Sequence, residues 1–222
     1  MPAIVDGTDI TGRGHPDMIV AYWTGGAHCC LLHYVFELES TFRLLATLDA
    51  EDDDMAHFAQ LDGDNRDYYL AADWTFAYWP GSFAGSPSHS VVLRYEDDHR
   101  GGGFHLALDK MKRDPPTSVQ WYEAMGAVNG ALQEDAMQGE VLAATLWNTV
   151  LDLIYIGHSD LAWRFINEAG PKAQQGTNVT LADFCSVLKA SPYWPDLEPT
   201  VKDMPSACAH AKPDEARRRP LR

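Results

Sequence analysis

The stretch Asp114-Pro115-Pro116-Thr117 divides the sequence into two parts with different hydrophobic patterns. Two successive prolines continue neither a β-ladder nor a helix, because proline has no amide hydrogen and restricts the residue before it. We therefore expect an antiparallel β unit over residues 1–114 and a helical part over residues 117–200, followed by a partly disordered tail over 201–222. The predicted fold class is α+β.

Before the two prolines, short apolar runs rich in β-branched and aromatic residues alternate with clusters of Asp, Asn, Gly and Pro. Such runs are typical of strands, and the clusters between them are typical of turns. The short spacing favours antiparallel pairing. The expected strands cover residues 18–23, 29–38, 42–48, 68–72, 91–95 and 104–108.

After the prolines, the apolar residues recur at steps of three and four, which indicates helices. Gly157 is expected to end one helix, Ser159-Asp160 to cap the next, and Thr180 to cap a helix over residues 181–189. The tail from Pro213, with its three successive arginines, is expected to be a solvated end rather than a binding arm. The residues that carry the helical period are Leu142, Leu146, Val150, Leu153 and Ile154.

The charge of the chain is strongly acidic. Its 222 residues include 17 Lys and Arg against 32 Asp and Glu, a formal net charge of −15. A nucleic-acid partner is excluded because such a partner needs a basic face to displace counterions, and the chain has no basic stretch outside its tail. Membrane insertion is excluded because no apolar run is long enough to span a bilayer.

The cysteines leave the cellular compartment open. Cys29 and Cys30 are adjacent and follow the turn signal Gly25-Gly26, whereas Cys185 and Cys208 lie near the end of the chain. This pattern fits two disulfides or four buried thiols. Adjacent residues of a regular strand point to opposite faces, so a Cys29–Cys30 bond requires a turn. If the protein is exported, we expect that bond, which leaves Cys185–Cys208 as the second pair.

Two acidic loops each lead directly into an expected strand. The first runs from Asp9 to Asp17, and the second runs from Gln60 to Asp67. In both, oxygen-bearing side chains alternate and a residue that tolerates positive φ occupies the sixth place. This arrangement supplies the oxygens that calcium prefers. The alternative is that the side chains form Asx-type turns that need no ion.

Both loops resemble the calcium loops of FG-GAP (VCBS-type) repeats, which form the blades of integrin-like β-propellers. The family pattern is Asp-x-Asp-x-Asp-Gly-x-x-Asp. In the first loop, Asp9, Thr11 and Asp17 match the first, third and ninth places, but Arg13 brings a positive charge to the fifth place. The residues that match in the second loop are Gln60, Asp62 and Asp64, with the carbonyl of Arg66 at the seventh place and Tyr68 at the ninth.

The resemblance implies weak Ca²⁺ binding, an exported location and a partial propeller or two packed sheets, since two repeats are too few to close a propeller. Further segments, among them the one from Trp23 to Cys30 and the one from Leu151 to His158, resemble uncharacterised bacterial secreted proteins with such repeats. Because of this resemblance, we expect a periplasmic or extracellular protein. The sequence as given begins without a signal peptide, so its leader would be absent here. A cytoplasmic location is the alternative.

An aromatic run supplies a candidate interaction surface. Trp74, Phe76 and Tyr78 alternate, so on a strand they share one face, and Trp79 follows them. If exposed, this face binds a partner, and if covered, it belongs to the core.

No motif for a nucleophile, phosphate loop or metalloprotease occurs in the sequence. We therefore expect a non-enzymatic exported binding or structural protein that acts through a protein partner or a larger assembly. The alternative is a secreted hydrolase of a carbohydrate or other extracellular polymer. A cleft with two facing carboxylates beside Trp74 or Trp79 would favour the hydrolase.

Overall fold

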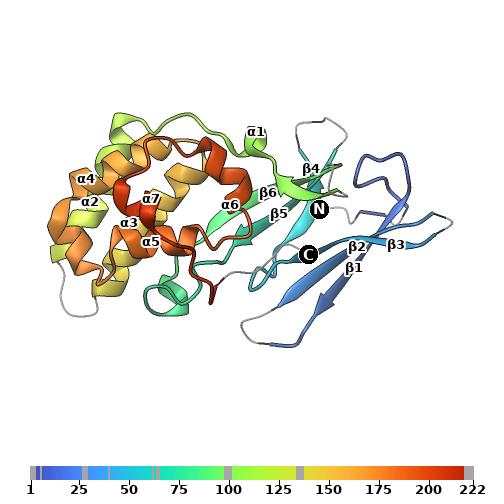
Figure 1. Ribbon diagram of the computed structural model, residues 1–222, viewed down its shortest axis with the longest axis horizontal. Coiled ribbons are helices and arrows are strands. Elements are labelled where there is room, and N and C mark those ends of the chain that lie inside the picture. The colour runs from blue at the N-terminus through green and yellow to red at the C-terminus, as the bar shows by residue number, and fades with distance from the viewer. Residues whose placement is uncertain are drawn as a thin grey trace. The chain divides into compact units, whose positions relative to one another are not determined.

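The computed structural model describes residues 4–5, 7–26, 30–39, 41–61, 63, 66–97, 102–133 and 138–217 (Figure 1). The chain forms two compact units. The first contains the residues up to Asp73 together with Ser90–Ala107, and the second contains Trp74–His89 and Leu108–Arg219. The α+β class is confirmed, but the division differs from the expected one, because residues 74–89 belong with the helices.

Two antiparallel sheets make up the first unit. One has three strands in the order β1-β2-β3, and the other has four in the order β4-β5-β6-β7. The expected strands all appear, and the short β4 was missed because four residues carry little periodic signal. The bounds are β1 Asp17–Trp23, β2 Leu31–Glu37, β3 Arg43–Asp49, β4 His57–Gln60, β5 Asp67–Asp73, β6 His89–Glu96 and β7 Gly103–Leu106.

The core of the first unit is rich in aromatic rings. The ring of Phe58 lies 4.9 Å from that of Tyr69 and 5.9 Å from that of Phe104, measured between centroids. Val35, Tyr68 and Leu93 are also fully or almost fully buried. Large rings that fill the space between strands bury much apolar area and hold the strands in one register.

The second unit is helical. Gly157, with a φ of 91°, follows the end of α3 as expected, because glycine adopts this backbone conformation without strain. Thr180 and Asp183 form a reciprocal capping box at the start of α5. The bounds are α1 Leu108–Met111, α2 Ser118–Gln133, α3 Gln138–Tyr155, α4 Ser159–Gly176, α5 Leu181–Leu188, α6 Trp194–Leu197 and α7 Ser206–His210, with short 3₁₀ turns at Phe83–Gly85 and Glu198–Thr200.

The expected cap of α4 was wrong. Residue His158 precedes the helix and makes no side-chain cap, while Ser159 is the first helical residue. The Ser159 hydroxyl instead accepts a hydrogen bond from the amide of Lys202 at 2.9 Å. The Ser159 hydroxyl therefore serves a tertiary contact with the C-terminal segment instead of capping the helix.

The aromatic run after β5 contributes mainly to the core of the second unit. Residues 75–78 form turns rather than a strand, so the expected alternation of faces does not arise. Phe76 and Trp79 are buried, and Trp79 lies 5.9 Å from Trp147 between ring centroids. Trp74 is half-buried, and Tyr78 is exposed. The expected interaction surface is thus reduced to one exposed ring beside a half-buried one.

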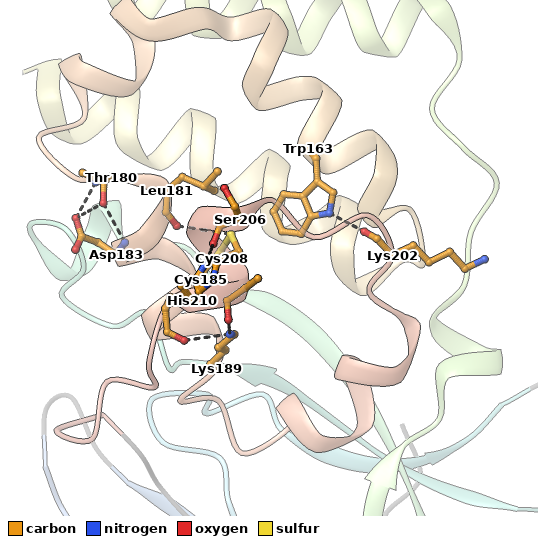
Figure 2. Close-up of a disulfide and its surroundings, with 12 residues drawn as sticks. Trp163, Thr180, Leu181, Asp183, Cys185, Lys189, Lys202, Ser206, Cys208 and His210 are labelled. Carbon is orange, nitrogen blue, oxygen red and sulfur yellow. Dashed lines mark hydrogen bonds between the residues drawn. A yellow bond between two sulfur atoms is a disulfide. The ribbon is translucent and has the colours of Figure 1, made fainter.

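A disulfide between Cys185 and Cys208 joins α5 to α7, with the two Cα atoms 5.1 Å apart (Figure 2). Both cysteines are buried. The Lys189 ammonium donates to the carbonyls of Ala209 and Ala211, and the Ser186 hydroxyl donates to the carbonyl of Lys212. The pairing of Cys185 with Cys208 therefore agrees with the sequence prediction. Cys29 lies outside the described residues, so its bond to Cys30 stays a prediction.

The C-terminal segment remains attached to the second unit as far as Arg217. The Arg217 guanidinium donates to the carbonyls of Thr75 and Ala77, at 3.1 and 2.7 Å. The amide of Asp214 donates to the carbonyl of Ser186. Disorder was expected from Pro213 onward, but these bonds hold residues 213–217. They are tertiary contacts, which a local sequence pattern does not predict.

None of the helices in the described part of the chain is both long enough and apolar enough to cross a membrane.

Candidate functional site

The two loops that resemble calcium loops meet at one pocket of the first unit. The pocket has a volume of about 340 Å³ and is lined mainly by charged side chains. Asp9 and Thr11 come from the first loop, and Arg66 and Asp67 come from the end of the second. The remaining lining residues are Ile10, Gly12, Arg13, Arg94, Tyr95, Glu96 and Asp97.

Hydrogen bonds to backbone amides fix the first loop. The Asp9 carboxylate accepts from the amide of Arg13 at 3.0 Å and from the amide of Gly14 at 2.8 Å. Gly14, at the sixth place of the loop, has a φ of 83°, a positive value that glycine adopts without strain. The Asp9 side chain thus bonds the amides four and five residues further on, which closes the loop around it rather than forming the Asx turn with the amide two residues on.

Asp17 is the buried acid of the first loop, with 0% of its surface exposed. Its Oδ2 accepts three hydrogen bonds of 2.9 Å, from the amides of Ile10 and Thr11 and from the Thr11 hydroxyl. Its Oδ1 is buried and has no hydrogen-bond partner. Burial raises the pKa of the Asp17 carboxyl above its ordinary value, against the opposing effect of the hydrogen bonds from Thr11 and Ile10.

The side chain of Arg13 leaves the first loop. Its Nε lies 3.3 Å from the Glu37 carboxylate, and its NH1 donates to the Tyr95 hydroxyl at 3.2 Å and to Asp97 at 3.4 Å. These contacts tie the first loop to β2 and to the end of β6, and the Arg13 side chain still lines the pocket. A positive charge at this place repels a cation.

In the second loop, the buried acid is Asp67 rather than a residue at the ninth place. The Gln60 side chain hydrogen-bonds the Asp67 carboxylate, and burial raises the pKa of this carboxyl. Tyr68, which falls at the ninth place of the family pattern, is buried in the core. Asp62 and Asp64 lie outside the described residues, so their part in an ion site stays a prediction.

The described residues do not by themselves make a calcium site. Among them, no three His, Cys, Asp or Glu side chains lie together in a way that would hold a metal ion. Asp9 and Asp17 together offer four carboxylate oxygens, whereas calcium takes six to eight oxygens. Further oxygen donors would be needed for a calcium site.

A second candidate site lies on the three-stranded sheet. In β2, Leu31-Leu32-His33-Tyr34-Val35-Phe36-Glu37, the buried positions are His33, Val35 and Glu37. The half-buried positions opposite them are Leu32, Tyr34 and Phe36. A half-exposed antiparallel sheet ordinarily turns its apolar side inward. Here the more apolar side of the strand faces outward.

The register of the strands extends this outward side across the whole sheet. Three rows of three side chains each cross this side of the sheet, from β1 through β2 to β3. We call these nine side chains, together with Phe42, the outer face. Phe42 belongs to it because its ring stacks on Phe36 with centroids 4.6 Å apart. The rows are Met18-Phe36-Leu44, Val20-Tyr34-Thr47 and Tyr22-Leu32-Asp49.

Large apolar side chains on the outer face are open to solvent. The exposed fraction is 40% for Val20, 54% for Tyr22, 49% for Leu44 and 57% for Phe42. Single exposed apolar residues need no explanation, but a contiguous apolar patch on a folded protein marks a surface that binds something.

The inward side of the same sheet carries buried polar groups. Glu37, which is 5% exposed, bonds to Arg13 and, at 3.0 Å, to Arg43. His33, which is 7% exposed, shares a hydrogen bond of 2.9 Å with the Tyr69 hydroxyl. Burial lowers the pKa of His33 and raises that of Tyr69, because the charged form of each side chain is disfavoured away from water. These partners let the polar side of β2 face inward.

No protein-family model, curated protein or solved structure matches this chain. The likeness to FG-GAP loops therefore rests on the two sequence motifs alone.

Proposed function

We propose that this protein is an exported, non-enzymatic binding module that engages another protein through the outer face. The observation that supports this most strongly is the exposed apolar character of that face beside an inner face with partnered polar groups. Burying one aromatic or aliphatic side chain contributes roughly 1.5–3 kcal/mol. Three or four such residues can drive association once its entropy cost is met.

The hydrolase alternative has less support. It calls for two facing carboxylates beside Trp74 or Trp79, and of these rings Trp79 is buried in the second unit while Trp74 is half-buried and stacked on Phe83. The lining of the charged pocket includes no tryptophan. Binding therefore remains the function that we propose.

The buried disulfide supports the exported location in this proposal. Disulfides such as Cys185–Cys208 persist in oxidising compartments and are rare where thiols are kept reduced. Mass spectrometry of the unreduced native protein tests the location. A bonded Cys185–Cys208 pair in protein isolated from its own cells supports export, and free thiols at both positions argue against it.

Calcium also remains a proposal, centred on the second loop. Asp62 and Asp64 occupy neighbouring odd places and Gln60 adds an amide oxygen, so the three can converge on one ion. A ligand that binds only the folded protein raises its melting temperature. We expect millimolar calcium to raise the melting temperature and Asp64→Asn to reduce this increment. An identical melt with calcium and with chelator contradicts the proposal.

Site-specific photo-crosslinking tests the binding function. A photoreactive phenylalanine analogue replaces Tyr22 on the outer face or, as the control, Tyr122 of α2, which is 75% exposed. We expect a discrete adduct from position 22 that contains another protein and no adduct from position 122. The adducted protein is then purified and should bind the native chain but bind Tyr22→Ser weakly. Equal adducts at both positions, or none at position 22, contradict the proposed function.

A further inference from the structure

We infer that the protein forms a two-fold dimer in which the outer edge of β1 pairs antiparallel with β1 of a second copy of the chain. This inference goes beyond the proposed function, because it concerns the edge of the three-stranded sheet and not the binding of another protein by the outer face. It follows from the backbone groups along that edge, from the register that they select, and from the side chains that this register brings together.

The outer edge of β1 has no neighbouring strand. β1 is the last strand in the order β1-β2-β3 (Figure 1), so in the described part of the chain no strand pairs with this edge. At one end of β1 the amide of Leu38 donates to the carbonyl of Pro16. At the other end the amide of Thr24 donates to the carbonyl of Cys30. The even-numbered residues of β1 therefore bond to β2, and the backbone groups of the odd-numbered residues point to the outer edge.

Three residues of β1 supply the open part of this edge. The backbone of Asp17 bonds to residues 7–8 and so is occupied. Ile19, Ala21 and Trp23 follow, and their outward amides and carbonyls have no backbone partner among the described residues. An unpaired row of this kind is a template for another strand.

The sequence of β1 lacks the usual protection of an edge strand. Natural edges commonly carry a lysine, a proline or a β-bulge that keeps other strands away. Residues 18–23 include no charged residue and no proline, and β1 runs opposite β2 in an unbroken register. Large apolar side chains are exposed on both sides of the strand, 54% for Tyr22 and 67% for Trp23. An edge of this composition favours pairing over exposure to solvent.

Two-fold pairing of β1 with its own copy has one register that uses all three open residues. In it, Ala21 lies opposite Ala21 of the second copy, and Ile19 lies opposite Trp23 of the second copy. Every outward amide of these residues then has a carbonyl opposite it. A shift by two residues in one direction places Trp23 opposite Asp17, whose backbone is already bonded. A shift in the other direction places Ile19 opposite Gly25, beyond the end of β1.

The side chains that meet in this register are complementary. Val20 lies opposite Tyr22 of the second copy on the outer face, and Ile19 lies opposite Trp23 on the other side of the strand. Both are pairs of a β-branched and an aromatic residue, which stabilise antiparallel strands. The small Ala21 lies at the two-fold axis, where a side chain meets its own copy. A two-fold contact requires a surface that matches itself, and β1 meets this requirement on both of its sides.

Sedimentation velocity of the full-length protein tests the dimer. A short pair of strands buries little area, so we expect a monomer–dimer equilibrium with a dissociation constant of about 10–100 μM. The formal net charge of −15 repels a second copy at long range, whereas the paired residues carry no charge. Moderate salt screens this repulsion and should shift the equilibrium toward the dimer. A monomer at every concentration up to about 200 μM, or an assembly larger than a dimer, overturns the inference.

Two variants of the exposed Ala21 test the register. Ala21→Lys and Ala21→Glu each place like charges opposite one another at the axis, so each should weaken self-association at least about tenfold. In a mixture, the lysine of one chain meets the glutamate of the other, and association should return to within about threefold of the unaltered protein. The control variants Val119→Lys and Val119→Glu carry the same charges at a position of α2 that is 65% exposed, and they should associate normally. No recovery in the mixture, or equal losses at the two positions, overturns the inference.

Hydrogen exchange of the unaltered protein locates the contact without a substitution. The amides of Ile19, Ala21 and Trp23 should exchange more slowly in concentrated than in dilute solution. Those of Val20 and Tyr22, which bond to β2, should be protected in both. Fast exchange of the three outward amides in the dimer overturns the pairing of edges.

The photoreactive group at position 22 separates this inference from the proposed function. It lies opposite Val20 of the second copy, so an adduct of two copies reports the dimer, and an adduct with a different polypeptide reports the proposed function. Mass spectrometry of the adducts distinguishes them. A different polypeptide on a chain that sediments only as a monomer shows that the dimer is wrong and leaves the proposed function standing. Adducts of two copies alone contradict the proposed function and support the dimer.

Discussion

The two faces of the three-stranded sheet divide polarity in an unusual way, because the inward face buries polar groups beside Val35 and Leu48 while the outward face exposes large apolar ones. The inward face carries Asp17, His33 and Glu37, which are all buried. The outward face carries Tyr22, Phe36 and Leu44 among its exposed or half-buried residues. Buried polar groups must keep hydrogen-bond or charge partners, and each one here has at least one.

This contrast shows that alternation in a strand fixes two faces but does not say which one is buried. The inward groups cost desolvation, and their partners recover part of it. The outward apolar groups that stay exposed, such as Tyr22, gain little from folding alone. A protein that violates ordinary patterning at one place usually does so at a functional surface.

The largest loss of stability is expected from Glu37→Ala. It removes a buried carboxylate that is bonded to both Arg13 and Arg43. Breaking such a cluster should lower the free energy of unfolding by about 3 kcal/mol. Urea unfolding measures this. The control Arg43→Ala removes a half-exposed partner and should cost about 1 kcal/mol or less. Equal losses in the two variants would show that the buried carboxylate has no special role.

The next largest effect is expected at Asp17. Asp17→Ala deletes the acceptor of three hydrogen bonds to Ile10 and Thr11 and should lower the free energy of unfolding by about 2–3 kcal/mol. Asp17→Asn keeps an acceptor oxygen and removes a charge that is costly to bury, so its loss should be clearly smaller. A larger loss for Asn than for Ala would contradict the geometry of the first loop.

A pH effect is expected from His33. Burial lowers its folded pKa below the ordinary 6.5, so the unfolded chain binds the proton more readily. This group's contribution to stability is therefore present above pH 6.5 and is lost as the pH falls from there through the lowered pKa. Tyr69 shares its hydrogen bond, and Asp49 and Asp53 act on Tyr69.

The variant His33→Gln isolates that effect, because glutamine can still bond the Tyr69 hydroxyl but does not titrate. Asp17 and Asp67 have raised pKa values and change stability in the opposite direction, and both carboxyls are unaltered in the variant. Denaturation at a series of pH values should show a shallower acid loss for the variant. Parallel curves for the two proteins would place the acid sensitivity elsewhere.

The smallest stability effect is expected on the outer face. Tyr22→Ser replaces a side chain that is 54% exposed, so the free energy of unfolding should change by no more than about 0.5 kcal/mol. The same urea unfolding experiment measures it. A loss as large as that of Asp17→Ala would mean that Tyr22 supports the fold rather than a contact with another molecule.

The sequence predicted the class and most elements of the fold, because strand and helix periods are local. It also predicted the ends near Gly157 and Thr180, where one residue type suits one backbone conformation. It did not predict that residues 74–89 belong with the helices, since the burial of Phe76 and Trp79 depends on residues as distant as Trp147 and Phe184.

For the candidate sites, the sequence indicated the two loops but not that they share one pocket, because their meeting depends on tertiary packing. It missed the outer face as well. The only local signal was the alternation in β2, where Leu32, Tyr34 and Phe36 form the more apolar set and would be assigned to the core. The ion pairs of Glu37 with Arg13 and Arg43, which help the other set face inward, come from other parts of the chain.

Hydroxyl-radical footprinting of the native protein tests the exposed outer face most directly. Oxidation of aromatic side chains follows their contact with water. We expect strong oxidation of Tyr22 and Phe42 and little oxidation of the buried Tyr69 and Phe58. Strong oxidation of Tyr69 together with protection of Tyr22 would contradict this expectation, because the two faces of the sheet would then be exchanged.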